Sequence, residues 1–318
     1  MIPRAQRLNR LLPAALVAAG LSACVVEPAT SPRPQPAPVR PAPSPETAPE
    51  TAKSAAARLY FAEVQRVLLS QGLLRTDTGA RDAPFGQRQL TENFIRIALY
   101  DEYSRSAGAF TRGETPSILR KWVAPVRMQI HFGASVPEAR RATDRARISS
   151  YLARLSGVTG HPMSVVESGG NFSLYIVSED EREALAPQLR ADMPGLSAKD
   201  IHDVTAMPRT TYCLVYALSK GSSGVYARAV AVVRAEHPDL LRQSCFHEEI
   251  AQGLGLPNDY PRARPSIFND DEEFALLTPM DEMMLKMLYD PSLRPGMAEA
   301  EARPIVESLA RRLLGGDT

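Results

Sequence analysis

The sequence predicts a single α+β domain with a mixed sheet, preceded by an export signal and a linker. Apolar residues first follow a helical period, then short strands alternate with helices, and the helical period returns at the end. The chain has 318 residues, 44% of them hydrophobic, which suffices for one large core. Its 37 basic and 36 acidic side chains give a net charge of +1, which excludes a polyanion binder that acts through bulk charge.

Residues 1–23 have the features of a bacterial lipoprotein signal peptide. Three arginines precede an apolar run over residues 11–20 that is too short to span a bilayer as a stable helix. The run is followed by Leu-Ser-Ala-Cys, which resembles a lipobox ending at Cys24. We therefore expect Cys24 to be acylated and to become the first residue of the mature protein, so that lipid joins the protein to the membrane.

Loss of this signal changes the charge of the protein. It removes three of the 37 basic side chains and none of the 36 acidic ones, which leaves a net charge of −2. No nucleic-acid partner is therefore expected. Val25 follows the anchor where an aspartate would mark retention in the inner membrane, so we expect a lipoprotein of the outer membrane that faces the periplasm.

Residues 24–51 are predicted to form a linker. Nine of the 27 prolines lie between Pro28 and Pro49, a composition that favours extended polyproline II and cannot bury a core. At about 3.1 Å per residue the linker reaches roughly 80 Å. The globular domain is expected to begin near Ala52 and to extend over 52–318.

Periodicity and turn residues predict the elements of this domain. Apolar spacing predicts helices, and Thr91 and Pro137 suit the starts of two of them. Alternation in Val-Arg-Met-Gln-Ile-His-Phe predicts a half-buried strand. The expected helices cover 52–74, a segment from Thr91, 137–156, 179–190, 240–256, 278–289 and 299–314. The expected strands cover 126–132, 163–167, 172–177, 211–218 and 225–234.

Two glycine-containing segments join pairs of these strands. Ser-Gly-Gly-Asn at 168–171 reads as a hairpin-like turn between the second and third strands. Lys-Gly-Ser-Ser-Gly at 220–224 joins the last two strands.

Cys213 and Cys245 are the two cysteines that remain beside the anchor. Disulfides persist in exported proteins, so we expect these two to be bonded. The bond would close a loop of about 30 residues and stabilise the fold by about 3 kcal/mol in the chain-entropy model. Two free buried thiols are the alternative.

The segment 245–259 carries the one informative motif. His247 and Glu248 could open the zinc motif H-E-x-x-H, but Ala251 stands where the second histidine must be. The longer motif H-E-x-x-H-x-x-G-x-x-H fits if Gly255 is its glycine. The helical ligand positions then fall on Glu248 and Gln252.

In the same register, the general-base position falls on Glu249 and the third ligand position on Asn258, which Asp259 follows. Downstream, Ser-Ile-Phe-Asn at 266–269 is similar to the Met-turn of metzincins, with Phe268 in the place of the methionine.

The strings EEIAQGLGLPND, PSIFNDD, LTPMDEMMLKMLYDP and LRPGM resemble the bacterial domain-of-unknown-function family 2927, over about residues 85–300. The resemblance to this family implies no particular activity. The motif spacing further resembles that of zincin metallopeptidases, which implies a single zincin-like domain with a mixed sheet and an active-site-type helix.

The ligand positions argue against catalysis. An amide is a poor zinc ligand, and oxygen-only sets suit harder cations, so we expect neither a catalytic metal nor another cofactor. The predicted function is binding of an envelope protein or peptide by an inactive peptidase-like domain. Zincin clefts hold an extended peptide along an edge strand, and the strand at 225–234 is the expected edge.

Two alternatives remain open. One is a metal-dependent hydrolase with an atypical Glu/Gln/Asp site, in which Glu248 and Asp259 hold a hard cation and Glu249 is the base. The other is a purely structural envelope lipoprotein.

Overall fold

The computed structural model describes residues 49–106, 109–269 and 271–315, without the side chains of 102–114. The predicted signal peptide, Cys24 and almost all of the linker lie outside the described residues. The strands are β1 (Tyr100–Ser106), β2 (Ala109–Pro116), β3 (Lys121–Trp122), β4 (Val126–Phe132), β5 (Met163–Val166), β6 (Phe172–Val177), β7 (Cys213–Ser219) and β8 (Val225–Arg234). The helices are α1 (Ala52–Ser70), α2 (Gln87–Ala98), α3 (Glu138–Thr159), α4 (Glu179–Glu183), α5 (Ala186–Asp192), α6 (Ala198–Thr205), α7 (Asp239–Gly255), α8 (Pro279–Leu288) and α9 (Glu299–Leu313).

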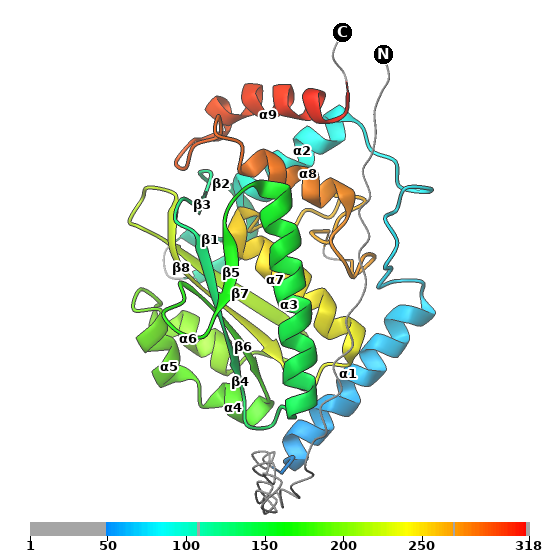
Figure 1. Ribbon diagram of the computed structural model, residues 1–318, viewed down its shortest axis with the longest axis vertical. Coiled ribbons are helices and arrows are strands. Elements are labelled where there is room, and N and C mark those ends of the chain that lie inside the picture. Colours follow the sequence, from blue (N-terminus) through cyan, green and yellow to red (C-terminus); the bar gives the residue numbers. More distant parts are fainter. Residues whose placement is uncertain (1–48, 107–108, 270, 316–318) are drawn as a thin grey trace, which may run out of the picture. The chain divides into compact units, whose positions relative to one another are not determined.

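The protein is a mixed α/β structure built around a mostly parallel six-stranded sheet (Figure 1). β5, β4, β6 and β8 lie side by side and all run parallel, and the short β3 also pairs in parallel with the start of β8. β7 alone runs antiparallel, along the side of β8 that faces away from β6. The strands predicted at 211–218 and 225–234 are β7 and β8, and the segment between them joins an antiparallel pair.

The predicted hairpin between residues 163–167 and 172–177 is wrong. β5 and β6 lie on opposite sides of β4, and each pairs with it in parallel. The connection crosses β4 so closely that a Cβ on Gly170 would lie 2.8 Å from the Gln129 Cβ atom. Gly170 therefore serves a close crossing, because no side chain at this position fits between the two segments.

The predicted edge strand is also wrong. β8 pairs with β6 on one side and with β7 on the other, so 225–234 lies inside the sheet. Its last six residues are all buried, as expected for a strand covered on both faces. Among the described residues β8 is the only strand that pairs with β7, which makes 213–219 the edge.

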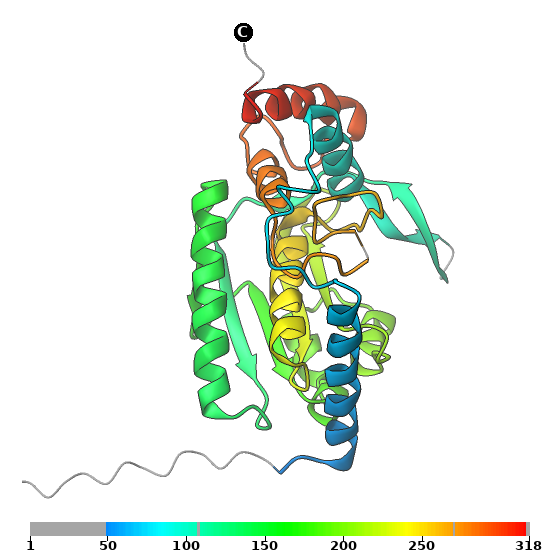
Figure 2. The same ribbon diagram turned by 90° about the vertical axis from the view of Figure 1, so that its right-hand side faces the viewer.

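Two hydrophobic cores fill the two faces of the sheet. On one face, alternate residues of β4, β6 and β8 pack against α3 and α7, with Leu152 and Ile250 among the buried side chains. On the other face, Tyr175 and Val232 pack against α5 and α6 through Leu189 and Ile201. The sheet is thus the middle layer of three, and Figures 1 and 2 show α3 and α7 on one side of it.

The helix predictions hold with shifted ends. α2 begins after Gly86 rather than at Thr91, whose side chain is buried inside the helix. Pro137 is the N-cap of α3 as expected, but the helix continues to Thr159 and ends at Gly160 in the left-handed conformation. Helix α6 and the β1–β2 hairpin were not predicted, and the hairpin projects from the body in Figure 2.

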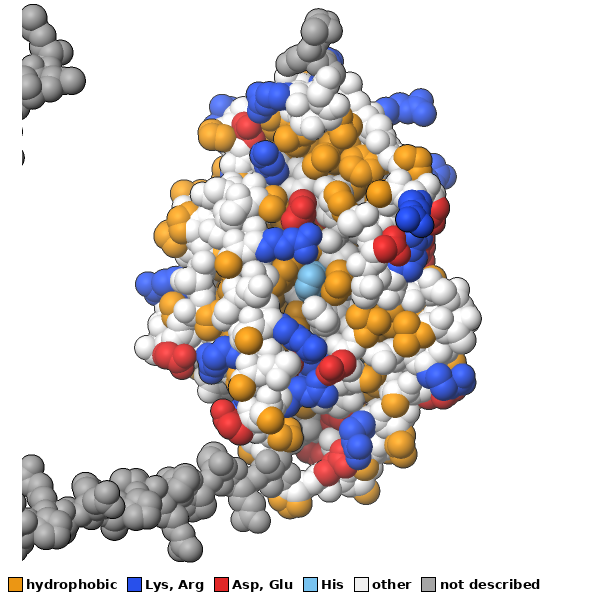
Figure 3. Space-filling model, turned by 45° about the vertical axis from the view of Figure 1, so that its right-hand side comes forward, with side chains coloured by type: hydrophobic (Ala, Val, Ile, Leu, Met, Phe, Trp, Pro, Cys, Tyr) orange, Lys and Arg blue, Asp and Glu red, His pale blue; other side chains and the backbone are white. Residues whose placement is uncertain are grey.

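The described surface mixes both signs of charge. On the face drawn in Figure 3, Lys and Arg side chains alternate with Asp and Glu side chains. Within the described ranges, no helix combines the length and the apolar character needed to cross a bilayer.

Candidate functional site

Helix α7 carries the motif and packs across the sheet. Pro238 is its N-cap and offers no side-chain hydrogen bond, so Gln65 supplies the cap from α1. The Gln65 Oε1 atom accepts hydrogen bonds from the backbone N–H groups of Leu240 and Leu241, at 3.1 and 3.0 Å. This cap satisfies two of the N–H groups that a helix start leaves free.

Two glycines let the end of α7 lie close to its neighbours. A Cβ on Gly253 would lie 2.6 Å from the Phe172 ring and 3.2 Å from Val215, so the helix contacts β6 and β7 here. Gly255 has φ +126°, and a Cβ there would lie 2.2 Å from the carbonyl oxygen of Arg120. Gly255, the glycine of the predicted motif, therefore ends α7 in a backbone conformation that would strain other residues.

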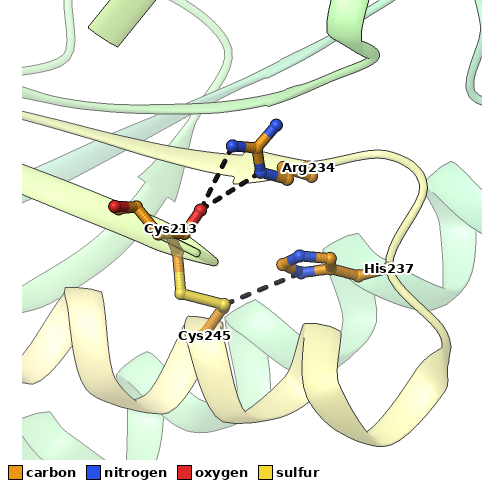
Figure 4. Close-up of a disulfide and its surroundings, with 5 residues drawn as sticks. Cys213, Arg234, His237 and Cys245 are labelled. Atoms are coloured by element: carbon orange, nitrogen blue, oxygen red, sulfur yellow. Dashed lines mark hydrogen bonds between the residues drawn. A yellow bond between two sulfur atoms is a disulfide. The ribbon is translucent and has the colours of Figure 1, made fainter. Parts of the chain in front are cut away.

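The predicted disulfide is confirmed and ties β7 to α7. Cys213, the first residue of β7, is bonded to Cys245 with 5.9 Å between Cα atoms (Figure 4). The Nδ1 atom of His237 lies 3.7 Å from the Cys245 sulfur. The bond fixes one end of the edge strand over the helix that carries Glu248 and Glu249.

Glu249 is a buried carboxyl group, only 4% exposed. Within the described residues its Oε2 atom has no hydrogen-bond partner. Burial raises the pKa of Glu249 well above its ordinary value, and the nearby carboxylates of Asp259 and Glu272 raise it further. Burial therefore disfavours the ionised form of this side chain, which is the form that acts as a general base.

The other predicted ligand positions point to different partners. Gln252 donates a hydrogen bond from Nε2 to the Asp259 Oδ1 atom, at 3.1 Å. Asn258 is fully buried, and its Nδ2 atom donates to the carbonyl oxygen of Arg96 at the end of α2, at 2.9 Å. The structure thus brings Gln252, Glu249 and Asp259 together but uses the Asn258 amide to hold α2.

A zinc ion does not fit these residues. In the described part of the chain, Cys213, Glu248 and Glu249 place one ligand-type atom each within 4.8 Å of one another. Zinc needs thiolate, imidazole or ionised carboxylate ligands. The Cys213 sulfur is in the disulfide and the raised pKa of Glu249 disfavours its ionised form, so these three residues do not supply the ligands that zinc prefers.

His247 has a structural place. Its ring stacks on Tyr151 with 4.0 Å between centroids, and its Nδ1 atom accepts a hydrogen bond from the N–H of Leu277 at 3.0 Å. Burial lowers the pKa of His247 to about 3, so the imidazole is neutral. It joins α7 to α3 and to the segment before α8.

Comparison with known protein families shows which family this chain belongs to. A family model described as "Protein of unknown function (DUF2927)" matches residues 87–308, more than half of the chain. The chain belongs to the DUF2927 family. No curated protein was found to match it.

The DUF2927 blocks that the sequence analysis singled out meet at Asp281. This carboxyl group accepts hydrogen bonds from Ser266 Oγ, from the N–H of Ile267 and from both the N–H and the hydroxyl of Thr278. Thr278 and Asp281 form the capping box of α8. Burial raises the pKa of Asp281 to about 6, because desolvation outweighs these hydrogen bonds.

Sequence reasoning missed this role of Asp281 in the DUF2927 domain, although a signal was available. Thr-x-x-Asp just before an apolar run is a capping-box pattern, and Pro279 suits the first helical position. The proximity of Glu272 to Glu249 had no comparable signal, because it depends on how the loop between α7 and α8 folds back.

Replacing Glu249 with Gln should stabilise the protein increasingly as pH rises. A raised folded-state pKa means that the folded protein holds the proton more tightly than the unfolded chain, whose glutamates titrate near pH 4.3. The native protein therefore loses stability as pH rises from there toward the folded pKa, by up to about 1.4 kcal/mol per pH unit. Gln cannot ionise and avoids this loss.

Urea unfolding of both proteins between pH 4 and 8 measures the difference. Glu167→Gln is the matched control, because it removes a carboxylate whose side chain is 86% exposed. A difference in unfolding free energy between Glu249→Gln and the native protein that stays constant with pH would contradict the raised pKa of the buried Glu249.

Proposed function

We propose that this DUF2927 protein is a lipid-anchored component of the bacterial cell envelope whose folded domain binds an extended peptide segment along β7 without cutting it. Among the described residues no strand other than β8 pairs with β7, and this free side of the strand, called its open edge below, is the observation that carries the proposal. A peptide in extended conformation can add a strand to such an edge, where main-chain hydrogen bonds give affinity. The envelope location and the lipid anchor at Cys24 are supported by the lipobox, the basic and apolar signal segment and the proline-rich linker.

The arrangement around β7 supports a zincin-like relationship. The one antiparallel strand lies at the edge of a parallel sheet, and the next strand, β8, leads directly into the helix with the motif. In zincins the substrate lies along the edge strand beside such a helix. Here the disulfide and the Gly253 contact with Val215 hold β7 against α7, so the edge is a rigid template.

Binding is favoured over hydrolysis because of the state of the side chains. The base position is held by a buried Glu249 with a raised pKa, and Gln252 and Asn258 engage their amides in hydrogen bonds. A site that activates water needs an ionised base or a metal with an open position. The raised pKa of Glu249 and the poor set of zinc ligands disfavour both, although the edge strand beside these residues remains.

Proline substitutions on β7 test the peptide-binding proposal. Successive N–H groups of a strand point to opposite edges, so Tyr216→Pro and Ala217→Pro affect different sides. One of the two variants loses a backbone hydrogen bond to β8, which lowers the free energy of unfolding. The other variant loses only an N–H group on the open edge of β7, where proline is tolerated. Urea unfolding identifies which variant is which.

The stable proline variant is then compared with the native full-length chain in selection from a random peptide library on phage. We expect the native protein to enrich peptides from the library. The stable variant should bind the enriched peptides at least tenfold more weakly. Tyr216→Ala controls for loss of the side chain. No enrichment by the native protein, or equal binding by the stable variant, would overturn the proposal.

Two further measurements address the rival functions and the anchor. Elemental analysis of the purified protein and of Glu248→Ala tests the hydrolase, because stoichiometric zinc that is lost in the variant would favour a metal enzyme. Cys24→Ser should move the protein out of the membrane fraction. Retention of that variant in the membrane would contradict lipid anchoring.

A further inference from the structure

Side chains of the kind that bind metals lie around the Cys213–Cys245 disulfide. The Nδ1 atom of His237 is 3.7 Å from the Cys245 sulfur, and Figure 4 shows its ring pointing toward that atom. A carboxylate oxygen of Glu248 lies within 4.8 Å of the Cys213 sulfur. Thiolate, imidazole and carboxylate groups are the ligands that zinc takes in proteins. In the oxidised protein the bond between the two sulfurs prevents them from acting as thiolates.

Three segments hold these four side chains near one another. Cys245 and Glu248 are three residues apart on α7, so they lie on the same face of the helix. His237 comes directly before Pro238, the N-cap of that helix, and Cys213 is the first residue of β7. The set therefore joins the start of the edge strand to α7 and to the segment that leads into it.

The distances suit a tetrahedral zinc site. With Zn–S bonds of about 2.3 Å and Zn–N bonds of about 2.0 Å, a ligand nitrogen and sulfur lie about 3.6 Å apart and two sulfurs about 3.8 Å apart. The 3.7 Å between His237 and Cys245 already matches the first value. The Cα atoms of the two cysteines are 5.9 Å apart, so rotation of their side chains can separate the sulfurs once the bond is broken.

The charges near the disulfide also suit such a site. Burial lowers the pKa of His237 well below its usual value, and the positive charges of Arg234 and Arg242 lower it further. The imidazole is therefore neutral at pH 7, which is the form that binds metals. Zinc with two thiolates and the Glu248 carboxylate carries a net negative charge, which the two nearby arginines favour.

We propose that reduction of the disulfide creates a structural zinc site. Its four ligands are Cys213, Cys245, His237 and Glu248. A dithiol supplies the two electrons and two protons that break the S–S bond, and it becomes a disulfide itself. Zinc then displaces both thiol protons to water, while the imidazole binds through Nδ1 and keeps its proton on Nε2.

The zinc ion takes over the structural role of the covalent bond. Cys213 and Glu248 are half-buried, so this end of the site is open to an entering ion, whereas Cys245 and His237 are buried. Bound zinc keeps β7 joined to α7 under reducing conditions, and it should restore the protection from hydrogen exchange that β7 loses on reduction. The site is independent of the proposed peptide binding, because it is measured by metal uptake of the reduced protein.

Titration with Co²⁺, a spectroscopic substitute for zinc, tests the site. The detergent-solubilised full-length chain is reduced with dithiothreitol, which is then removed by anaerobic gel filtration. We expect the reduced protein to take up one Co²⁺ per chain with the charge-transfer absorption of thiolate ligands, and Zn²⁺ to displace it. The oxidised protein should show neither effect. No uptake by the reduced protein, or equal uptake by the oxidised protein, would overturn the proposal.

Variants at the cysteine and at the imidazole locate the ion. Cys213→Ser should abolish the thiolate absorption of a two-sulfur site, and unchanged binding would place the metal on another cysteine. His237→Phe keeps a ring against Phe61, whose centroid is 4.5 Å away, and should weaken zinc binding at least tenfold. His202→Phe is the matched control, since it removes an exposed imidazole on α6. Equal zinc affinity of the two histidine variants would contradict the site.

Glu248→Gln tests the carboxylate ligand at a half-buried position, where folding is less at risk than at His237. An amide is a poor zinc ligand, so this variant should also bind zinc at least tenfold more weakly than the native reduced protein. Glu167→Gln, at a side chain that is 86% exposed, is its control. Circular dichroism of each variant confirms that it is folded. Native-like affinity of Glu248→Gln would remove this residue from the ligand set and overturn the assignment.

Discussion

Replacing Arg234 with Met should lower the free energy of unfolding by about 3–5 kcal/mol, the loss expected when one partner of a buried ion pair is removed. The guanidinium group pairs with Glu179 and donates to the carbonyl oxygens of Met207, Pro208 and Thr211. Its side chain is only 1% exposed. The substitution would leave a buried carboxylate and three carbonyl groups short of donors.

Arg234 remains charged at neutral pH. Burial lowers its pKa to about 10, and the neighbouring Glu179 carboxylate opposes this shift. Its contacts join the end of β8 to the segment before β7 and to α4, so the loss should appear in the cooperative unfolding of the whole domain. Urea unfolding monitored by circular dichroism measures it.

Arg66→Met is the matched control for this prediction. It also removes an arginine from an ion pair, but the Arg66 side chain is 66% exposed and its partner Glu63 is 59% exposed. Such pairs contribute about 0–1 kcal/mol. A loss at Arg234 no larger than the loss at Arg66 would show that the buried network does not stabilise the fold.

Reduction of the Cys213–Cys245 disulfide should lower the free energy of unfolding by about 3 kcal/mol, because the unfolded chain regains the freedom that a closed loop removes. The two residues are 32 positions apart in the sequence. The bond joins the start of the edge strand to α7 (Figure 4), so hydrogen exchange in β7 should also become faster.

Urea unfolding of the native protein with and without a reductant measures this effect without altering any side chain. The double variant Cys213→Ala with Cys245→Ala should be at least as unstable as the reduced protein, and insensitive to the reductant. Equal stability of the oxidised and the reduced protein would contradict the prediction.

Local patterns predicted the elements near the site well, because each depends on residues close in sequence. The alternation at 126–132 is β4, and the motif helix at 240–256 is α7 within one residue at each end. The segments at 211–218 and 225–234 are the antiparallel pair β7 and β8. The disulfide also followed from counting cysteines in an exported chain.

Strand pairing was predicted less well. Both errors, the hairpin between β5 and β6 and the assignment of β8 as the edge, concern which strands lie next to each other. A continuous apolar strand such as β8 indicates burial on both faces, but it does not name its neighbours. The segment 167–171 carries the chain from one side of β4 to the other, and the strand patterns do not indicate this crossing.

The sequence by itself determined that the motif of α7 lacks the histidines of a zinc site, and that its register is set by Gly255. Only the tertiary structure decided that the Asn258 amide binds the end of α2, and that Glu249 is buried with a raised pKa. The reason is physical. Residue type and spacing fix the chemistry that a side chain can offer, whereas its pKa and its partners depend on burial and on segments that are distant in the sequence.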